Sequence, residues 1–431
     1  MAGHSGRREK EEGKGTQCRL WVVCLSPLIL LFVCLPTLAL AATYSGGAGT
    51  AGSPFLISTV PDFRAIGDSS ADWDKRFKLT QDIDLSDCNE ANLHMIGHWV
   101  MLGSNANRPF TGEFDGNGKT ISNFRYKNMT DDYVGLFQHA TGVIKNLRLV
   151  RATVVGNKAG VGALVGYLDQ GSVVECRATE VSITGNNRVG GLVGSASGIV
   201  STSYSSGSVS GVLYVGGLIG QAGSGTVALS YSKAQVTGSE NVGGLIGITL
   251  KEDSFVNSCY ATGDVKGVLY VGGLIGQISP GKVSRCYCAG KVSGSQSVGG
   301  LVGSQRALSD VQGSLWDTQT SRQTTSAAGT GKTTAQMKSE ATFRVVNWDF
   351  FNTWSICEGV GYPVFLWQIP PGDLRCPDGV NFTDFVWFAA NWRNRDCGVF
   401  NYNCDGADLD VSGVVEFRDL AIFAENWLAG L

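Results

Sequence analysis

The sequence predicts a mainly β protein: a β-solenoid (β-helix) with coils of about 27 residues, followed by a small α-helical module. Three observations lead to this prediction. Glycine accounts for 59 of the 431 residues and proline for 10, a glycine-rich hexapeptide recurs at a nearly constant interval, and a second short motif follows its copies. Because glycine in a helix interior costs about 1 kcal/mol relative to alanine, glycines spread this evenly favour strands and tight turns. Charged residues make up 16% and hydrophobic residues 43%, which excludes bulk disorder.

The first 41 residues are predicted to be a secretory signal peptide. A basic stretch precedes an uncharged run from Leu20 to Ala42, which ends in the small-residue pattern Ala39-Leu40-Ala41. This run is long enough to span a bilayer, so an uncleaved anchor is the alternative, but Pro27 and Pro36 favour cleavage after Ala41. We therefore expect a secreted or cell-surface protein. Export permits one or two disulfides, and at least one of the nine cysteines after residue 41 should stay unpaired.

Charge and short motifs argue against nucleic acid and nucleotides as partners. The chain has a formal net charge of -3, and removal of the net basic signal segment makes it more negative, whereas nucleic-acid binding requires clustered positive charge. The segment Gly329-Thr330-Gly331-Lys332-Thr333 imitates a phosphate-binding loop. However, Ser326 stands where the full motif requires glycine.

The hexapeptide VGGLIG, or a close variant, organises the centre of the chain. Its copies begin at valines spaced 26 to 29 residues apart, and a shorter relative precedes the first: Val134, Val161, Val189, Val215, Val242, Val271 and Val298. Repeats of this length, with two or three short strands each, predict a solenoid in which matching positions of neighbouring coils lie ~4.8 Å apart. The leucines of the Gly-Gly-Leu step should then point inward: Leu192, Leu218, Leu245, Leu274 and Leu301. A β-propeller is the alternative, but its blades need ~40 residues.

The regular repeats are flanked by less regular segments. Residues 42–133 are expected to form an N-terminal cap and the first coils, with a helix near Val60–Ile66 covering the open end of the solenoid. Residues 134–303 carry the regular repeats, and residues 304–370 form an irregular closing region.

The second motif of each coil places one residue in a column on the side of the predicted rod. The first copy is Cys176-Arg177-Ala178, and the middle residue becomes tyrosine in the next four copies: Tyr204, Tyr231, Tyr260 and Tyr287. Because an unpaired arginine is costly to bury, this column is predicted to face solvent. Stacked tyrosines either stabilise adjacent strands or offer a platform for sugar rings or a partner, and we treat all four as candidate ligand-binding residues. Cys259 and Cys286 share a neighbouring column and are expected to be buried thiols.

These units resemble GLUG repeats, the glycine-rich repeats of secreted and surface-exposed bacterial proteins. The resemblance covers about residues 134–303, and the preceding segment, which contains Phe110–Gly118, is similar to the leader that often precedes such repeats. The resemblance implies a β-solenoid on the outside of the cell.

Residues 371–431 differ in character, with fewer glycines and more aromatic and acidic residues. The segment Phe382–Trp392 recurs 35 residues later as Phe417–Trp427, and both copies read as short amphipathic helices. Oxygen-bearing residues before the second copy have the spacing of a calcium loop, with a turn glycine at position 6. The predicted ligands of Ca²⁺ are Asp408, Asp410, Ser412, the backbone carbonyl of Val414, Glu416 and Asp419.

This arrangement resembles dockerin modules, which pair two loop-helix segments and bind a cohesin partner. The resemblance implies calcium binding and a cohesin-like or other cell-surface partner for residues 371–431. Cys376, Cys397 and Cys404 flank the gap between the two copies, so one local disulfide could brace the module.

The first copy departs from the calcium pattern. Aligned without a gap, Asp373 and Asp384 hold loop positions 1 and 12, but Arg375 and Pro377 hold positions 3 and 5. A one-residue deletion instead puts Asp378 at position 5. The sequence leaves open whether this half binds metal.

No catalytic residue can be nominated from the sequence. The G-x-S-x-G motif is absent, and His94 and His98 lack the glutamate of the zinc protease motif, which is replaced by Met95. Paired carboxylates for sugar cleavage converge in space and leave no local pattern. We therefore interpret the chain as a non-catalytic binding or adhesion protein, with polysaccharide as a candidate ligand and a calcium-dependent tether. The alternatives are a polysaccharide-degrading enzyme (a glycoside hydrolase or lyase on a β-helix) or a component of such a complex, and a purely structural spacer.

Overall fold

The computed structural model describes residues 44–98, 107–376, 378–398 and 402–429. The predicted signal segment, residues 1–41, lies outside this part of the chain. Within the described residues, no helix has the length and apolar character needed to cross a bilayer.

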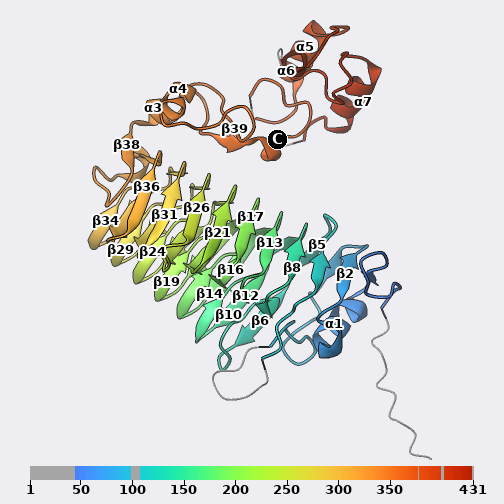
Figure 1. Ribbon diagram of the computed structural model, residues 1–431, viewed down its shortest axis with the longest axis vertical. Coiled ribbons are helices and arrows are strands. Elements are labelled where there is room, and N and C mark those ends of the chain that lie inside the picture. The colour runs from blue at the N-terminus through green and yellow to red at the C-terminus, as the bar shows by residue number, and fades with distance from the viewer. Residues whose placement is uncertain (1–43, 99–106, 377, 399–401, 430–431) are drawn as a thin grey trace, which may run out of the picture. The chain divides into compact units, whose positions relative to one another are not determined.

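The predicted β-solenoid is confirmed, and Figure 1 shows its coils as successive layers of parallel arrows. Equivalent valines of neighbouring repeats are in register: Val161 pairs with Val189, Val189 with Val215, and the series continues to Val298. Each regular coil contains four or five short strands, more than the two or three that the sequence suggested.

Four stacks of strands, parallel throughout, run along the solenoid. The first contains β1 (Phe55–Ile57), β2 (Arg76–Leu79), β4 (Glu113–Asp115), β8 (Val143–Lys145), β13 (Ser172–Val174), β17 (Ile199–Ser201), β21 (Gly225–Ala228), β26 (Ser254–Asn257), β31 (Gly281–Ser284) and β36 (Ser309–Gln312). The second contains β3 (Ile83–Asp84), β5 (Thr120–Ser122), β6 (Arg125–Asn128), β9 (Arg148–Val150), β10 (Thr153–Gly156), β14 (Arg177–Thr184), β18 (Tyr204–Ser210), β22 (Tyr231–Ser232), β23 (Gln235–Thr237), β27 (Tyr260–Ala261), β28 (Val265–Lys266), β32 (Tyr287–Cys288), β33 (Val292–Ser293), β37 (Leu315–Asp317) and β38 (Thr330–Lys332).

The other two stacks complete the coils. The third contains β11 (Ala159–Val161), β15 (Asn187–Gly190), β19 (Leu213–Gly216), β24 (Glu240–Gly243), β29 (Leu269–Gly272) and β34 (Gln296–Gly299). The fourth contains β7 (Phe137–Ala140), β12 (Val165–Leu168), β16 (Val193–Ala196), β20 (Ile219–Ala222), β25 (Ile246–Thr249), β30 (Ile275–Ile278) and β35 (Val302–Gln305).

One residue per coil turns the chain from the first stack into the second. It is left-handed although it is not glycine, in six consecutive coils: Asn146, Glu175, Thr202, Leu229, Ser258 and Arg285, with φ from 49° to 55°. A corner this short explains why a coil of some 27 residues has room for more strands than the sequence suggested.

The interior of the coils is packed as predicted. The five repeat leucines are completely buried: Leu192, Leu218, Leu245, Leu274 and Leu301. The glycines beside them allow the backbones of neighbouring coils to come close together. A Cβ added to Gly217 would lie 2.1 Å from the carbonyl oxygen of Gly244, so no other residue fits there without moving the backbone.

Helix α1 (Val60–Asp68) forms where the sequence predicted a cap. The side chain of Thr59 accepts a hydrogen bond from the backbone N–H of Asp62, whose carboxylate accepts one from the N–H of Thr59. Phe63 and Ile66 of this helix belong to the solenoid core. The short 3₁₀ helix η1 (Ser70–Asp72) follows.

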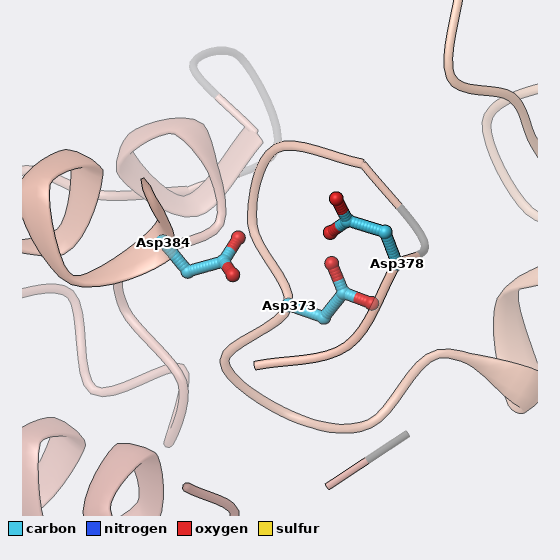
Figure 2. A group of neighbouring side chains, drawn as sticks. All are labelled: Asp373, Asp378 and Asp384. Atoms are coloured by element: carbon cyan, nitrogen blue, oxygen red, sulfur yellow. The ribbon is translucent and has the colours of Figure 1, made fainter. Parts of the chain in front are cut away.

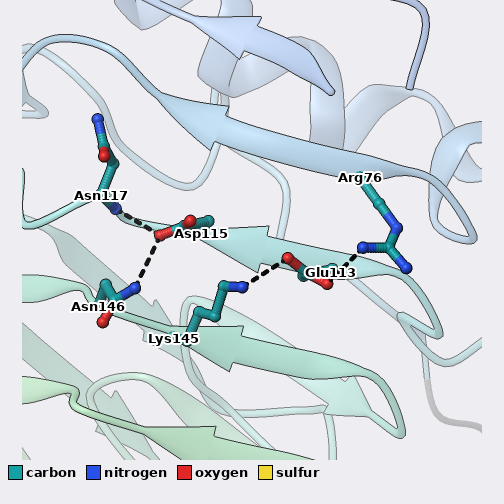
Figure 3. Close-up of polar contacts among 6 residues, drawn as sticks. All are labelled: Arg76, Glu113, Asp115, Asn117, Lys145 and Asn146. Atoms are coloured by element: carbon teal, nitrogen blue, oxygen red, sulfur yellow. Dashed lines mark hydrogen bonds and ion pairs between the residues drawn. The ribbon is translucent and has the colours of Figure 1, made fainter. Parts of the chain in front are cut away.

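Charged side chains pair between the first coils (Figure 3). Glu113 of β4 lies between Arg76 of β2 and Lys145 of β8, with N···O distances of 2.9 and 2.8 Å. On the same strand, Asp115 accepts hydrogen bonds from Asn117 and from the side chain of Asn146. Alternating charges in adjacent coils therefore stabilise this outer face, where like charges would repel.

The closing region after β37 is more ordered than the sequence suggested. It contains α2 (Thr318–Ser321), α3 (Thr334–Met337), α4 (Glu340–Arg344), the antiparallel pair β39 (Trp354–Ser355) and β40 (Val364–Phe365), and the 3₁₀ helix η2 (Leu366–Gln368). Aromatic side chains from this region form a second hydrophobic core together with the tyrosine column.

The last part of the chain contains the two predicted helices, α5 (Phe382–Ala390) and α7 (Phe417–Glu425), each nine residues long. The short element α6 (Tyr402–Asp405) lies between them in sequence. A small core of their own holds them together, formed mainly by Val380, Phe388, Val415 and Phe423.

Candidate metal centres and the tyrosine column

The loop before α7 gathers three carboxylates. Ligand oxygens of Asp408, Asp410 and Asp419 all lie within 4.8 Å of one another. Asp408 and Asp419 are buried, with 2% and 0% of their surface exposed. Three buried or half-buried carboxylates this close repel each other unless a cation lies between them.

Backbone N–H groups of the loop fix the orientation of these carboxylates. Asp419 accepts hydrogen bonds from the N–H groups of Leu409, Asp410 and Glu416. Asp408 accepts from those of Ser412 and Gly413. The hydrogen bonds from Ser412 lower the pKa of Asp410.

The other three predicted ligands, Ser412, Val414 and Glu416, are not part of the carboxylate cluster. The hydroxyl of Ser412 donates to the carbonyl oxygen of Val414 at 3.1 Å, so these two groups already share a hydrogen bond. The side chain of Glu416 is exposed and stands outside the carboxylate cluster. Of the six residues predicted to bind Ca²⁺, the structure therefore brings the three aspartates together.

The first loop, for which the sequence left the question open, gathers an equivalent cluster (Figure 2). Ligand oxygens of Asp373, Asp378 and Asp384 also lie within 4.8 Å of one another, and Figure 2 shows Asp373 and Asp378 on the loop and Asp384 at the start of a helix. Arg375, at loop position 3, packs over the ring of Trp387 with its guanidinium carbon 4.2 Å from the ring centroid. Pro377, at loop position 5, lies outside the described residues.

The two loops use the same hydrogen bonds. Asp384 accepts from the N–H groups of Leu374, Arg375 and Asn381, just as Asp419 does in the second loop. The N–H of Gly379 donates to Asp373, as that of Gly413 does to Asp408. This equivalence matches Gly379 with Gly413 and therefore supports the alignment with a one-residue deletion.

Asp373 has an environment that suits a bound cation. Burial raises the pKa of Asp373 to about 6, the negative charges of Asp384 and Asp378 add to the shift, and the hydrogen bond from Gly379 partly opposes it. Its Oδ1 atom is buried and has no hydrogen-bond partner among the described residues. An unpaired buried carboxylate oxygen is costly, and a hard cation would satisfy it.

The tyrosine column lies outside the solenoid core, as predicted, but it does not face solvent as a whole. The rings of Tyr204, Tyr231, Tyr260 and Tyr287 stack with centroid separations of 4.5, 4.6 and 5.0 Å. Tyr231, Tyr260 and Tyr287 are only 5%, 1% and 1% exposed.

The closing region covers these rings. Trp354 and Phe365 pack on Tyr260, whose hydroxyl donates to Gln368 at 3.0 Å. The hydroxyl of Tyr287 donates to the carbonyl oxygen of Pro363 at 2.7 Å. The expectation of an exposed ladder was wrong for three of the four tyrosines, because residues far along the chain supply the apolar partners. Tyr204 alone of the four remains partly exposed.

Cysteines follow the expectations from the sequence and add one bridge. Cys397 and Cys404 form the local disulfide, and Cys376 of the first calcium-like loop is bonded to Cys357 of the closing region. Cys259 and Cys286 are buried free thiols.

A hydrophobic groove of about 450 Å³ lies between the two helices of the last module. It is lined by Phe382 and Phe385 of α5, by Leu420, Phe423 and Ala424 of α7, and by Trp427. Phe382 is 72% exposed, so this face is apolar and open.

Comparisons with known proteins find two relatives whose sequences match part of this chain. No protein-family model matches. Halomucin of Haloquadratum walsbyi is 36% identical over 160 residues, which is 36% of this chain and 2% of halomucin. A "Putative Gly-rich membrane protein" of Evansella cellulosilytica is 37% identical over 131 residues, 29% of this chain and 14% of that protein. The chain thus spans a small part of the relatives it matches.

One solved structure is similar in part. It is the crystal structure of a "putative immunoglobulin A1 protease" from Bacteroides ovatus, with a TM-score of 0.48 and 19% sequence identity, over 75% of this chain and 95% of that one.

Proposed function

We propose that this protein is a secreted or cell-surface, non-catalytic β-solenoid of the GLUG-repeat type, whose C-terminal dockerin-like module binds two Ca²⁺ ions and docks on a partner protein. The observation that carries the proposal is the equivalence of the two carboxylate clusters. Each cluster lies on a loop that leads into a nine-residue helix, and each uses the same three N–H groups to hold the aspartate of that helix. The names of the two relatives, a mucin and a membrane protein, accord with a place outside the cell.

The carboxylate oxygens suit a hard cation such as Ca²⁺, which prefers six to eight oxygen ligands. Asp373, Asp378 and Asp384 would hold one ion, and Asp408, Asp410 and Asp419 the other, with backbone carbonyls and water completing each shell. The unpartnered oxygen of Asp373 is the observation that fits a cation there.

Calcium binding would also organise the docking face. Asp384 and Asp419 belong to the first turns of α5 and α7, and the hydrophobic groove is lined by side chains of the same two helices. A cation that ties each first turn to its loop therefore fixes the groove in one shape. An open apolar groove is the kind of surface that takes an apolar side chain or helix of a partner.

Calorimetric titration of the full chain with Ca²⁺ tests the proposal. We expect two equivalents, one lost in Asp408→Asn/Asp419→Asn and the other lost in Asp373→Asn/Asp384→Asn. Glu425→Gln, which changes an exposed acid at the end of α7, is the matched control and should keep both. Absence of binding in the intact chain, or binding that survives in both double variants, would overturn the proposal.

A further inference from the structure

The column that carries the tyrosines extends beyond the part that the closing region covers, and there its residues are arginines. Arg148, Arg177 and Tyr204 are neighbours in register on three successive coils. Trp367, near the end of the closing region, packs against Tyr204 at 6.4 Å between ring centroids and lies 5.9 Å from the guanidinium carbon of Arg177. The cover thus ends over Arg177, and Arg148 on the next coil is exposed.

A pocket of about 330 Å³ opens at this point. It is lined by Arg148 and Arg177, by the left-handed corner residues Asn146, Glu175 and Thr202, and by Trp367. Its volume is at the lower end of the range of small-molecule sites. Because the corner residues lie on rigid, stacked coils, their side chains are presented at a fixed spacing.

The positive charges of the pocket are unpaired. Neither Arg148 nor Arg177 forms an ion pair with another described residue, although they are neighbours in register. Like charges on adjacent strands repel. Arg177 is held in place by the faces of Tyr204 and Trp367, 5.7 and 5.9 Å away. Two neighbouring guanidinium groups without an ion-pair partner suit a carboxylate, which each can bind with two parallel hydrogen bonds.

The other residues that line the pocket favour a ligand that carries hydroxyl groups as well as a negative charge. Glu175 also faces the pocket without an ion-pair partner among the described residues, so the part of a ligand that lies beside its carboxylate must be neutral. This carboxylate accepts hydrogen bonds only, so its natural complement is a hydroxyl group. The side-chain amide nitrogen of Asn146 donates to Asp115 at 3.2 Å (Figure 3), so the side-chain oxygen Oδ1 of Asn146 is the atom that can accept a hydrogen bond from a ligand.

We propose that this pocket binds a uronic acid residue of an acidic polysaccharide. Arg148 and Arg177 bind the sugar carboxylate, Glu175 and Asn146 accept hydrogen bonds from ring hydroxyls, and the indole of Trp367 forms an apolar wall. The pocket involves none of the calcium ligands, so the proposal does not depend on the calcium module.

The test is calorimetric or NMR titration of the full chain, in calcium-free buffer, with trigalacturonate. The same trisaccharide with its carboxylates methyl-esterified is the ligand control, because it keeps the hydroxyls and loses the charge. Inorganic phosphate is the control for a simple anion site. We expect trigalacturonate to bind, and the ester and phosphate to bind about tenfold more weakly or not at all.

Variants connect the binding to the pocket. Arg148→Gln and Arg177→Gln should each weaken trigalacturonate binding about tenfold, and Glu175→Gln should weaken it less. Arg151→Gln is the matched control, since Arg151 is exposed near Arg148 and bonds to Asn123, and it should bind as the unchanged chain does. Circular dichroism checks that each variant keeps its β structure. No binding at about 1 mM ligand, equal binding of acid and ester, equal binding of phosphate, or unchanged binding in the Arg148→Gln/Arg177→Gln double variant would each overturn the proposal.

Discussion

Tyr231 and Tyr260 stack face to face across neighbouring coils, with ring centroids 4.6 Å apart and ring planes 1° from parallel. This separation is close to the spacing of strands in a sheet, so the solenoid itself holds the two rings in contact. The closing region packs further aromatic rings on this pair: the ring centroid of Phe365 lies 5.4 Å from that of Tyr260, and that of Trp367 lies 5.9 Å from that of Tyr231. The column therefore anchors the closing region to the side of the solenoid.

Replacing a covered tyrosine should cost much more stability than replacing the partly exposed one. We expect Tyr260→Ala to lower the free energy of unfolding by about 4 kcal/mol, because it leaves a cavity between stacked rings and removes a partly buried hydrogen bond to Gln368. Tyr204→Ala, the matched control at the partly exposed end, should cost about 1 kcal/mol. Denaturant unfolding followed by tryptophan fluorescence measures both, and equal losses would contradict the covering role.

Gly217 should tolerate no side chain. Alanine there places its Cβ 2.1 Å from the carbonyl oxygen of Gly244, so the two coils would have to separate and lose backbone hydrogen bonds. We expect Gly217→Ala to lower the free energy of unfolding by about 3 kcal/mol. Gly52→Ala is the control, because a Cβ at Gly52 meets no atom within 4 Å. Similar thermal midpoints for the two variants would show that the coils are less tightly packed than described.

Calcium should protect backbone amides in both loops. Hydrogen exchange of the full chain with and without Ca²⁺ should slow at Leu374 and Leu409, whose N–H groups donate to Asp384 and Asp419. The amides of the solenoid strands, such as Val215, serve as the internal reference and should not change. Slowing in the second loop alone would mean that the first cluster binds no metal under these conditions.

The pH dependence of folding stability should distinguish the first calcium-like loop from the second. The pKa of Asp373 is raised from 3.8 to about 6, so its protonated form contributes stability that is complete below the unfolded pKa and is lost as the pH rises through about 6. The calcium-free module should therefore gain stability from this group on acidification from about pH 7 to about pH 5, and Asp373→Asn should remove that gain.

Calcium and the proton compete for Asp373. We expect calcium binding at the first loop to release protons near pH 6 and to weaken between about pH 7 and about pH 5. Titrations in two buffers of different ionisation enthalpy count the protons, with Asp373→Asn as the control. Proton release that is the same in this variant would contradict the assignment.

The disulfide between Cys357 and Cys376 should stabilise the first loop. It closes a segment with a sequence separation of 19, and the loss of chain entropy on closing such a segment corresponds to about 3 kcal/mol. The Cys357→Ser/Cys376→Ser variant should therefore bind its first Ca²⁺ more weakly, since Cys376 lies within that loop. Cys397→Ser/Cys404→Ser, which opens a shorter segment, provides the comparison. Unchanged calcium binding in the first variant would show that the loop keeps its shape without the bridge.

Much of the fold could be predicted because it repeats. A period near 27 residues with leucine and glycine at constant positions leaves one arrangement in which equivalent residues stack, and the buried Leu218 and the register of Val215 agree with it. The helices α5 and α7 were likewise predicted from a local apolar period. The number of strands per coil was underestimated because left-handed corners such as Glu175 carry no glycine signal.

The candidate sites were predicted less completely. The second calcium-like loop follows a known spacing, whereas the first lacks it, and only the fold shows that Asp378 reaches Asp373 and Asp384. The pocket around Arg177 could not be predicted at all. It joins corner residues of several coils to Trp367, and no local pattern links positions so far apart in the chain.

The sequence by itself determined the stacking of coils, the inward leucines and the pair of loop-helix segments, because each depends on a period or spacing within a few tens of residues. Only the tertiary structure decided which part of the tyrosine column meets solvent. The aromatic closing region, far along the chain, packs where it buries the most apolar surface. Burial of this kind depends on the folded surface and not on any short stretch of chain.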